Sequence, residues 1–166
     1  KNPPALFYDK ESGELVEDKY GSRGPTLGGM VGGEAGEIAV VNRPKGPKSR
    51  NLVDTVYRYR DGEWEVVPSP PNTYYDKAGN KVENDDLPER LEIGMGSDGQ
   101  LLLRVPTVKG SDAVFVETDV EGEYDILPPI SSGSGDFVKF LSQMSAGKKR
   151  DGSSKGSFRV YATYFY

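Results

Sequence analysis

Residues 56–67 read V-Y-R-Y-R-D-G-E-W-E-V-V and predict a β-hairpin. Asp61-Gly62 is a strong signal for a two-residue type I′ turn, because both central positions of that turn need a positive φ angle. A turn at this place gives one aromatic face and one charged face, through the cross-strand pairs Tyr57 with Val66, Tyr59 with Trp64, Arg58 with Glu65 and Arg60 with Glu63. We expect Tyr59 and Trp64 to point into the core and the Arg–Glu face to point to solvent or to an interface.

Four further antiparallel hairpins are predicted elsewhere in the sequence, on both sides of this one. In each of them, two short runs that contain apolar or β-branched residues flank a turn with glycine. The paired runs are residues 6–9 with 14–16, 74–76 with 81–83, 90–96 with 100–105, and 113–118 with 123–127. The Gly-rich residues 21–36 are interpreted as irregular backbone and not as a phosphate-binding loop, because no Gly-Lys-Ser/Thr ending follows them.

The last part of the chain predicts one helix and one strand. Phe137, Phe140, Leu141 and Met144 recur at helical spacing, which predicts a short α-helix near residues 136–146. Residues 157–166 read S-F-R-V-Y-A-T-Y-F-Y and carry apolar side chains on both faces, which is typical of a strand that is covered on two sides. Such a strand must be paired, because it would otherwise template aggregation.

Together these elements predict a mainly β fold, an antiparallel β-sandwich or jelly-roll-like domain with one short α-helix. We expect residues 1–166 to form a single all-β domain, with residues 1–9 as an N-terminal arm that can extend and residues 157–166 as a C-terminal strand. Residues 7–10 (F-Y-D-K) resemble residues 74–77 (Y-Y-D-K). Either a duplication or a shared strand-and-turn chemistry explains this similarity, and we favour the turn chemistry.

The composition argues against most catalytic chemistry. The chain has no cysteine and no histidine, so disulfides, thiol catalysis, Cys-ligated zinc and the commonest general acid–base group are all excluded. Carboxylate-based glycoside hydrolysis is the main remaining option, but none of the acidic residues lies in an apolar run that would raise its pKa. We therefore expect a protein that is not an enzyme. A net charge of −5 argues against a nucleic-acid partner, and no run of residues is apolar enough to span a membrane.

Two kinds of binding site are considered from the residues. Residues 83–86 (E-N-D-D) and the pair Asp119 and Glu121 are rich in oxygen and could hold a structural Ca²⁺, although solvated acidic turns are favoured and no cofactor is expected. Tyr57, Tyr59 and Trp64 share one face of the predicted hairpin and could stack on sugar rings if they are exposed. The same three side chains would make a good core if they are buried, and this is the interpretation that we favour.

The functional prediction is a non-catalytic structural subunit that self-assembles into an extracellular filament, a pilus-like structure or a virion. Copies of the chain would be joined by β-strand addition and loop packing into a homopolymer, without a nucleic-acid partner and outside the cell, on its surface or in a virion. The expected assembly interface comprises residues of both terminal segments: Leu6, Phe7, Tyr8, Phe158, Val160, Tyr161, Tyr164, Phe165 and Tyr166. The alternative is a secreted carbohydrate- or ligand-binding β-sandwich module, in which Tyr57, Tyr59 and Trp64 stack on the ligand.

Overall fold

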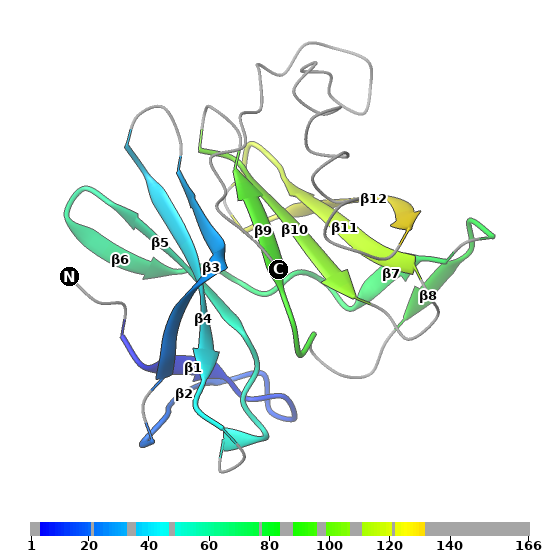
Figure 1. Cartoon of the computed structure of the whole chain (residues 1–166). Helices are drawn as coiled ribbons and strands as arrows, with labels where there is room; N and C mark the ends of the chain where they lie inside the picture. Colours follow the sequence, from blue (N-terminus) through cyan, green and yellow to red (C-terminus); the bar gives the residue numbers. More distant parts are fainter. Residues whose placement is uncertain are drawn as a thin grey trace.

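The computed structural model describes residues 4–20, 22–32, 36–46, 49–76, 78–83, 88–95, 99–106, 111–120 and 122–131. These residues form a mainly β structure with twelve strands, whose pairing is antiparallel throughout (Figure 1). The strands are β1 (Leu6–Tyr8), β2 (Leu15–Glu17), β3 (Ser22–Gly32), β4 (Ile38–Pro44), β5 (Thr55–Arg60), β6 (Glu63–Val66), β7 (Thr73–Tyr75), β8 (Lys81–Glu83), β9 (Glu92–Met95), β10 (Leu101–Pro106), β11 (Ser111–Glu117) and β12 (Tyr124–Ser131).

The strands form four sheets in the described part of the chain. Two are the hairpins β1–β2 and β7–β8, and two are four-stranded sheets in the orders β3-β4-β5-β6 and β12-β11-β10-β9. In both four-stranded sheets, strands that follow each other in the sequence are neighbours. The predicted hairpins therefore all form, as β1–β2, β5–β6, β7–β8, β9–β10 and β11–β12.

The hairpin of residues 56–67 has the predicted turn and register. Asp61 and Gly62 have φ angles of 53° and 81°, as a type I′ turn requires. Tyr59 lies opposite Trp64 and Arg58 lies opposite Glu65, and the other two predicted pairs also form.

The orientation of this hairpin differs from the prediction. Arg58 is only 3% exposed and points to the other four-stranded sheet, whereas Tyr59 and Trp64 are half-buried on the opposite face. The expectation that the charged face points to solvent is wrong at Arg58. The physical reason is that Arg58 finds a buried carboxylate across the sheets, and a paired guanidinium can be buried at much lower cost than an isolated one.

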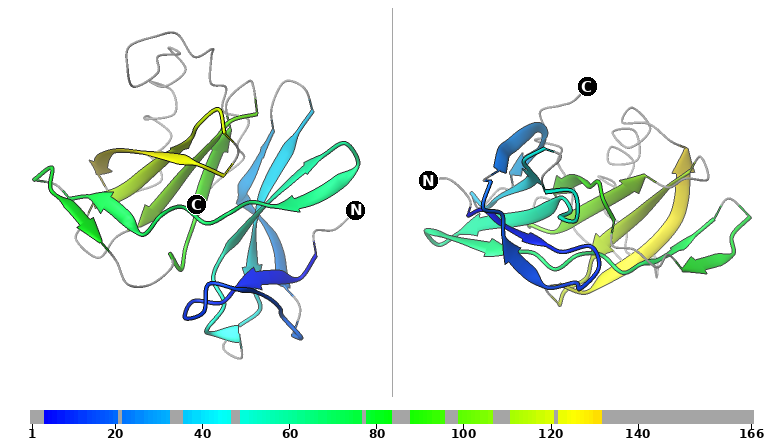
Figure 2. Two further views of the ribbon diagram at one scale, coloured as in Figure 1. Left: turned by 180° about the vertical axis from the view of Figure 1, so that it is seen from behind. Right: turned by 90° about the horizontal axis from the view of Figure 1, so that it is seen from below.

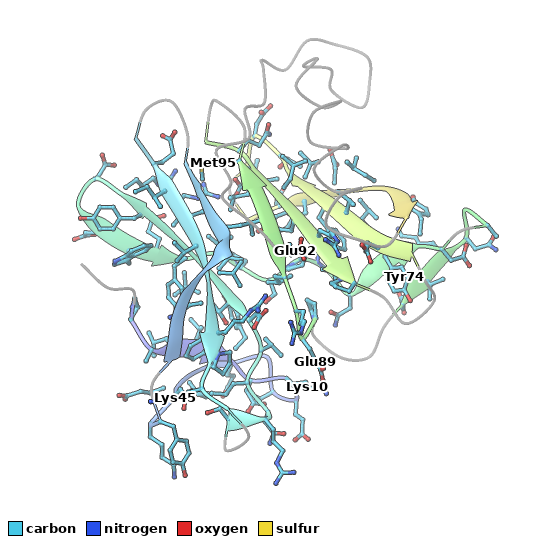
Figure 3. All side chains as sticks on the ribbon, in the orientation of Figure 1. Lys10, Lys45, Tyr74, Glu89, Glu92 and Met95 are labelled. Atoms are coloured by element: carbon cyan, nitrogen blue, oxygen red, sulfur yellow. The ribbon has the colours of Figure 1, made fainter. Side chains whose placement is uncertain are left out.

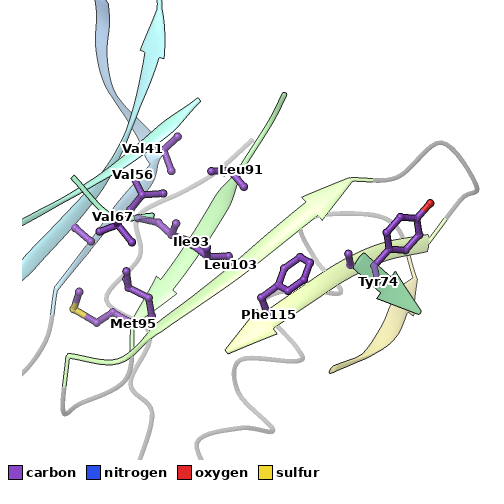
Figure 4. Close-up of a cluster of buried hydrophobic side chains, with 12 residues drawn as sticks. Val41, Val56, Val67, Tyr74, Leu91, Ile93, Met95, Leu103 and Phe115 are labelled. Carbon is purple, nitrogen blue, oxygen red and sulfur yellow. The ribbon is translucent and has the colours of Figure 1, made fainter. Parts of the chain in front are cut away.

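One apolar cluster includes side chains of both four-stranded sheets. In this cluster Val41, Val56 and Val67 lie near Leu91 and Ile93, and Phe115 lies farther from them, toward Tyr74 (Figure 4). The buried members of this cluster are Ala39, Val41, Val56, Val67, Tyr74, Leu91, Ile93, Met95, Leu101, Leu103, Ala113 and Phe115. The other face of the first sheet buries Val40 and Tyr57, and Phe7 of β1 is fully buried as well.

The two halves of the described chain have the same order of elements. A short hairpin precedes a four-stranded sheet in each half, first β1–β2 before β3–β6 and then β7–β8 before β9–β12. The registers correspond as well. Val40 of β4 lies opposite Tyr57, which lies opposite Val66, and in the second half Leu103 lies opposite Phe115, which lies opposite Ile126.

Turn geometry and sequence support the same correspondence. Six glycines with positive φ fall into three matched pairs that occupy equivalent turns, namely Gly13 with Gly79 (71° and 84°), Gly36 with Gly99 (87° and 85°) and Gly62 with Gly122 (81° and 84°). The last pair begins the similar segments 62–68 (G-E-W-E-V-V-P) and 122–128 (G-E-Y-D-I-L-P). The similarity between residues 7–10 and 74–77 thus belongs to an internal repeat, and turn chemistry alone does not explain it.

Other expectations have mixed outcomes. The Gly-rich residues 22–32 form the strand β3 instead of irregular backbone, and two shifts in its register with β4 accommodate the segment. The helix expected near residues 136–146 and the strand expected at 157–166 lie outside the described residues. No jelly-roll strand order occurs among the described strands, because both large sheets connect only neighbouring strands.

A buried ion pair joins the two four-stranded sheets. Nη2 of Arg58 on β5 donates to both carboxylate oxygens of Glu117 on β11, at 2.7 and 2.8 Å. The same carboxylate accepts hydrogen bonds from the backbone N–H groups of Leu101 and Gly122, at 3.4 and 3.3 Å. The ion pair thus connects the third strands of the two four-stranded sheets.

A second set of polar contacts ties the first repeat to the segment before β9. Oδ2 of Asp54 accepts hydrogen bonds from Nε of Arg43 and from the backbone N–H of Leu91, each at 3.2 Å. Nearby, the ammonium group of Lys10 lies 2.5 Å from the carboxylate of Glu89 (Figure 3). Burial raises the pKa of the Asp54 carboxyl above its ordinary value of 3.8, while Arg43 and the Leu91 N–H act in the opposite direction.

Breaking the Arg58–Glu117 pair from one side should destabilise the protein strongly. Glu117→Gln leaves the Arg58 guanidinium buried without a counter-charge, and we expect a loss of about 3–5 kcal/mol in the free energy of unfolding. The double variant Arg58→Met, Glu117→Leu should recover most of that loss, because it removes both charges. Urea unfolding followed by Trp64 fluorescence measures both effects, and a double variant as unstable as Glu117→Gln would contradict the assignment.

The contribution of Asp54 to stability should fall as the pH rises. Since the folded state raises the pKa of this carboxyl, protonation favours folding, and the stability is fully present below the ordinary pKa and is lost as the pH rises through the raised pKa. As the pH rises from the ordinary pKa to the raised pKa, we expect wild type to lose unfolding free energy relative to Asp54→Asn. Unfolding curves at a series of pH values test this, and a constant difference would contradict it.

Candidate functional site

The aromatic side chains of β5 and β6 form a small packed cluster. The Tyr57 and Trp64 rings lie 6.4 Å apart at 88°, and the Tyr59 and Trp64 rings lie 4.9 Å apart at 63°, so both pairs meet edge to face. Tyr57 is fully buried, whereas Tyr59 and Trp64 are half-buried. A flat platform for sugar stacking needs several exposed ring faces, and Tyr57 offers none in this arrangement.

Three of the residues expected at an assembly interface lie in β1 and are engaged within the chain. Phe7 is fully buried, and β1 pairs with β2 and lies against β5. The Tyr57 hydroxyl accepts a hydrogen bond from the backbone N–H of Leu6 at 3.1 Å and donates one to the Leu6 carbonyl. The backbone N–H of Tyr8 donates to the hydroxyl of Thr55 at 3.3 Å. Contact between Phe7 and another subunit would therefore require the β1–β2 hairpin to detach.

The remaining residues expected at the interface come from the end of the chain. They are Phe158, Val160, Tyr161, Tyr164, Phe165 and Tyr166, and all of them lie outside the described residues.

The outer edge of β6 is open among the described strands. Its main strand contact is with β5. The Val67 N–H donates to the Val56 carbonyl at 2.8 Å and so points toward β5. Because successive residues of a strand point their N–H groups to opposite sides, the N–H groups of Trp64 and Val66 point to the outer edge.

The other edges of the large sheets each have a neighbour. β3 and β9 lie against each other, and β12 lies beside β7 (Figure 2). β12 also carries Pro128 and Pro129, which cannot donate a hydrogen bond to an added strand. Within the described residues, β6 is thus the edge that is best suited to accept a further strand.

Several buried charged groups are held by partners of opposite charge or by hydroxyl groups. Nε and Nη1 of Arg104 lie 2.6 Å from the carboxylates of Asp112 and Glu92. The buried carboxylate of Asp18 accepts hydrogen bonds of 2.9 Å from the hydroxyl of Ser49. These contacts stabilise the folded state, because an opposite charge or a hydrogen-bond donor lowers the cost of burying each charged group.

The described residues contain no cluster of three or more acidic, His or Cys side chains that could hold a metal ion. Of the expected oxygen-rich segments, Glu83 is exposed at the end of β8 and Asp119 is exposed after β11, whereas residues 84–86 and 121 lie outside the described residues. Nor does the described part of the chain include a helix with the length and apolarity needed to cross a bilayer.

No family model matches this sequence, and comparison with curated proteins and with solved structures finds no significant match. The function therefore has to be argued from the residues themselves.

Sequence reasoning missed the polar residues that the fold brings together between the repeats. Glu117 ends the apolar run A-V-F-V-E, and Arg58 lies between Tyr57 and Tyr59. A charge inside an otherwise apolar strand is a signal of a buried pair. The identity of the partner depends on how the two sheets meet, which no local pattern contains.

Tyr57→Phe should loosen the β1–β2 hairpin. The substitution leaves the partly buried Leu6 N–H and carbonyl without the hydroxyl, and we expect a loss of about 1–3 kcal/mol in unfolding free energy. Burial raises the pKa of Tyr57 to about 12, so the stability from this group is present below pH 10 and is lost as the pH rises toward 12.

Alkaline unfolding curves measure this effect. Wild type should lose stability relative to Tyr57→Phe between pH 10 and 12. Tyr59→Phe is the matched control, since it removes a hydroxyl from the same face of the hairpin. Equal alkaline behaviour of all three proteins would contradict the role of Tyr57.

Proposed function

We propose that this chain is a non-catalytic structural subunit that self-assembles by β-strand addition. The assembly would be an extracellular filament, a pilus-like structure or a virion. The observation that carries the proposal is the outer edge of β6, where the N–H group of Val66 points away from β5 and no described strand pairs with that side. An added strand gains main-chain hydrogen bonds from such an edge and specificity from alternate side chains.

Residues 157–166 of a neighbouring copy have a pattern that suits this edge. Glu63 and Glu65 project from one face of β6, and Trp64 and Val66 project from the other. In the proposed donor strand, Arg159 alternates with Phe158 and Val160. An arrangement that places Arg159 beside the two glutamates also places Phe158 and Val160 beside Trp64 and Val66, so one register satisfies both faces.

The charges on β6 favour a selective interaction. Acidic side chains on an edge strand discourage pairing with unrelated strands. A donor strand that carries a basic residue at the matching position offsets this repulsion. The glutamates therefore support pairing with a specific partner and oppose general aggregation.

The proposal includes a sandwich arrangement for the subunit. It is supported by the apolar cluster that the two four-stranded sheets share. A non-catalytic role is supported by the pairing of buried charges, such as Arg58 with Glu117 and Arg104 with Asp112, which places them in the framework of the fold.

Removal of residues 157–166 should abolish assembly and leave the fold intact. We expect wild type to form higher-order species in size-exclusion chromatography with light scattering, and the truncated chain to elute as a monomer with an unchanged circular dichroism spectrum. Assembly by the truncated chain would contradict donation of this strand, and its global unfolding would assign the strand to its own subunit.

The acceptor edge has a sharper test. Val66→Pro removes an outward N–H without removing a bond to β5, so we expect it to block assembly. Val66→Ala is the matched control, because it shortens the same side chain and keeps the N–H. Assembly of Val66→Ala with a monomeric Val66→Pro would support the edge, whereas normal assembly of Val66→Pro would overturn it.

A further inference from the structure

The β1–β2 hairpin lies against the first four-stranded sheet and is held there by polar side chains of that sheet (Figure 1). Three of these side chains, which we call the docking face, come from β4 and β5. They are Asn42, Thr55 and Tyr57. Each of them forms a hydrogen bond with the backbone of residues 4–8, which include β1. The docking face therefore binds the main chain of an extended segment.

The bound backbone groups belong to every second residue of that segment. Nδ2 of Asn42 donates to the carbonyl of Pro4 at 3.3 Å, and the bonds described above engage Leu6 and Tyr8. Between these two residues, the side chain of Phe7 is fully buried. Hydrogen bonds to the main chain, together with pockets for individual side chains, are a general way in which proteins bind extended segments.

The second repeat has apolar side chains at the positions equivalent to the docking face. The strand registers identify these positions as Val105, Ala113 and Phe115. Ala113 and Phe115 belong to the apolar cluster, and so does Tyr74 of the β7–β8 hairpin. The first hairpin is thus held in part by hydrogen bonds that the equivalent side chains of the second repeat cannot form.

This difference lowers the cost of releasing the first hairpin. Water can form hydrogen bonds with the amide and hydroxyl groups of a vacated docking face, whereas vacated apolar side chains gain no such compensation. After β2 the chain passes through Lys19 and Tyr20, whose side chains are exposed. Extension of this connection would uncover little apolar surface, which suits it to act as a hinge.

We propose that two copies of this chain exchange their β1–β2 hairpins, so that the docking face of each copy holds residues 4–8 of the other. Because the copies have the same sequence, contacts within one chain can also form between two chains. Examples are the hydrogen bonds of Asp18 with Ser49 and the ion pair of Lys10 with Glu89. The inference rests on the proposed self-assembly for its choice of partner, but it uses a surface separate from the outer edge of β6.

Introduced cysteines report this exchange directly, because the chain has none of its own. Asp9 lies opposite Leu52 in an isolated antiparallel bridge, and the flanking hydrogen bonds make them the closely spaced kind of pair that a disulfide can join. When full chains with Asp9→Cys and with Leu52→Cys are mixed and mildly oxidised, we expect a shift from monomer to a linked dimer with one copy of each. Both chains carry Val66→Pro, so failure of pairing at the β6 edge does not affect the result.

Asp76→Cys is the matched control for Asp9→Cys. Asp76 has the equivalent place in the hairpin of the second repeat, and both carboxylates accept hydrogen bonds from their own turns. Mixed with Leu52→Cys, this control should give only the dimer that random collisions produce. Circular dichroism checks that each variant is folded. If Asp9→Cys is not, Lys10→Cys with Asn51→Cys provides the adjoining pair across the same bridge.

The docking face is tested by the rate of the same reaction. Tyr57→Phe in both chains should speed formation of the linked dimer by about tenfold or more, because it removes the hydroxyl that binds Leu6 and so favours release of the hairpin. Tyr59→Phe is the matched control and should leave the rate unchanged. A linked dimer no more abundant than in the Asp76→Cys control, or equal rates for the two tyrosine variants, would overturn the proposal.

Discussion

The buried ion pair between Arg58 and Glu117 is the interaction on which the arrangement of the two sheets depends. Each partner comes from the third strand of its own four-stranded sheet, and each would be costly to bury alone. The Glu117 carboxylate also accepts the backbone N–H groups of Leu101 and Gly122, which offsets part of the cost of removing it from water. Apolar contacts can slide at small cost, whereas this pair requires one position of β5 relative to β11.

The repeat explains how a chain of modest apolar content builds this core. Each half supplies the same elements, a short hairpin and a four-stranded sheet, and neither sheet can cover its own apolar face. The two repeats therefore contribute side chains to one shared apolar cluster. Equivalent positions of the two repeats carry different residues. Arg58 is equivalent to Val116, and Tyr59 is equivalent to Glu117, so each repeat supplies one charge of the ion pair.

Local patterns predicted the hairpins well, because turn chemistry and cross-strand pairing act over a few residues. Asp61-Gly62 set the register of its hairpin, and the predicted pair of Tyr59 with Trp64 formed. The orientation of the same hairpin was predicted wrongly, since the position of Glu117 depends on contacts far away in the sequence. Residues 21–36 were predicted as irregular backbone because they are rich in glycine, but pairing with β4 makes residues 22–32 a strand.

The two repeats should form one cooperative unit, held by the shared apolar cluster and the Arg58–Glu117 pair. Native-state hydrogen exchange of the full chain, measured amide by amide in increasing denaturant, tests it most directly. We expect the slowest amides of β4 and β5 and those of β10 and β11 to converge on a single opening free energy. Exchange of one repeat at a clearly lower free energy than the other would contradict it.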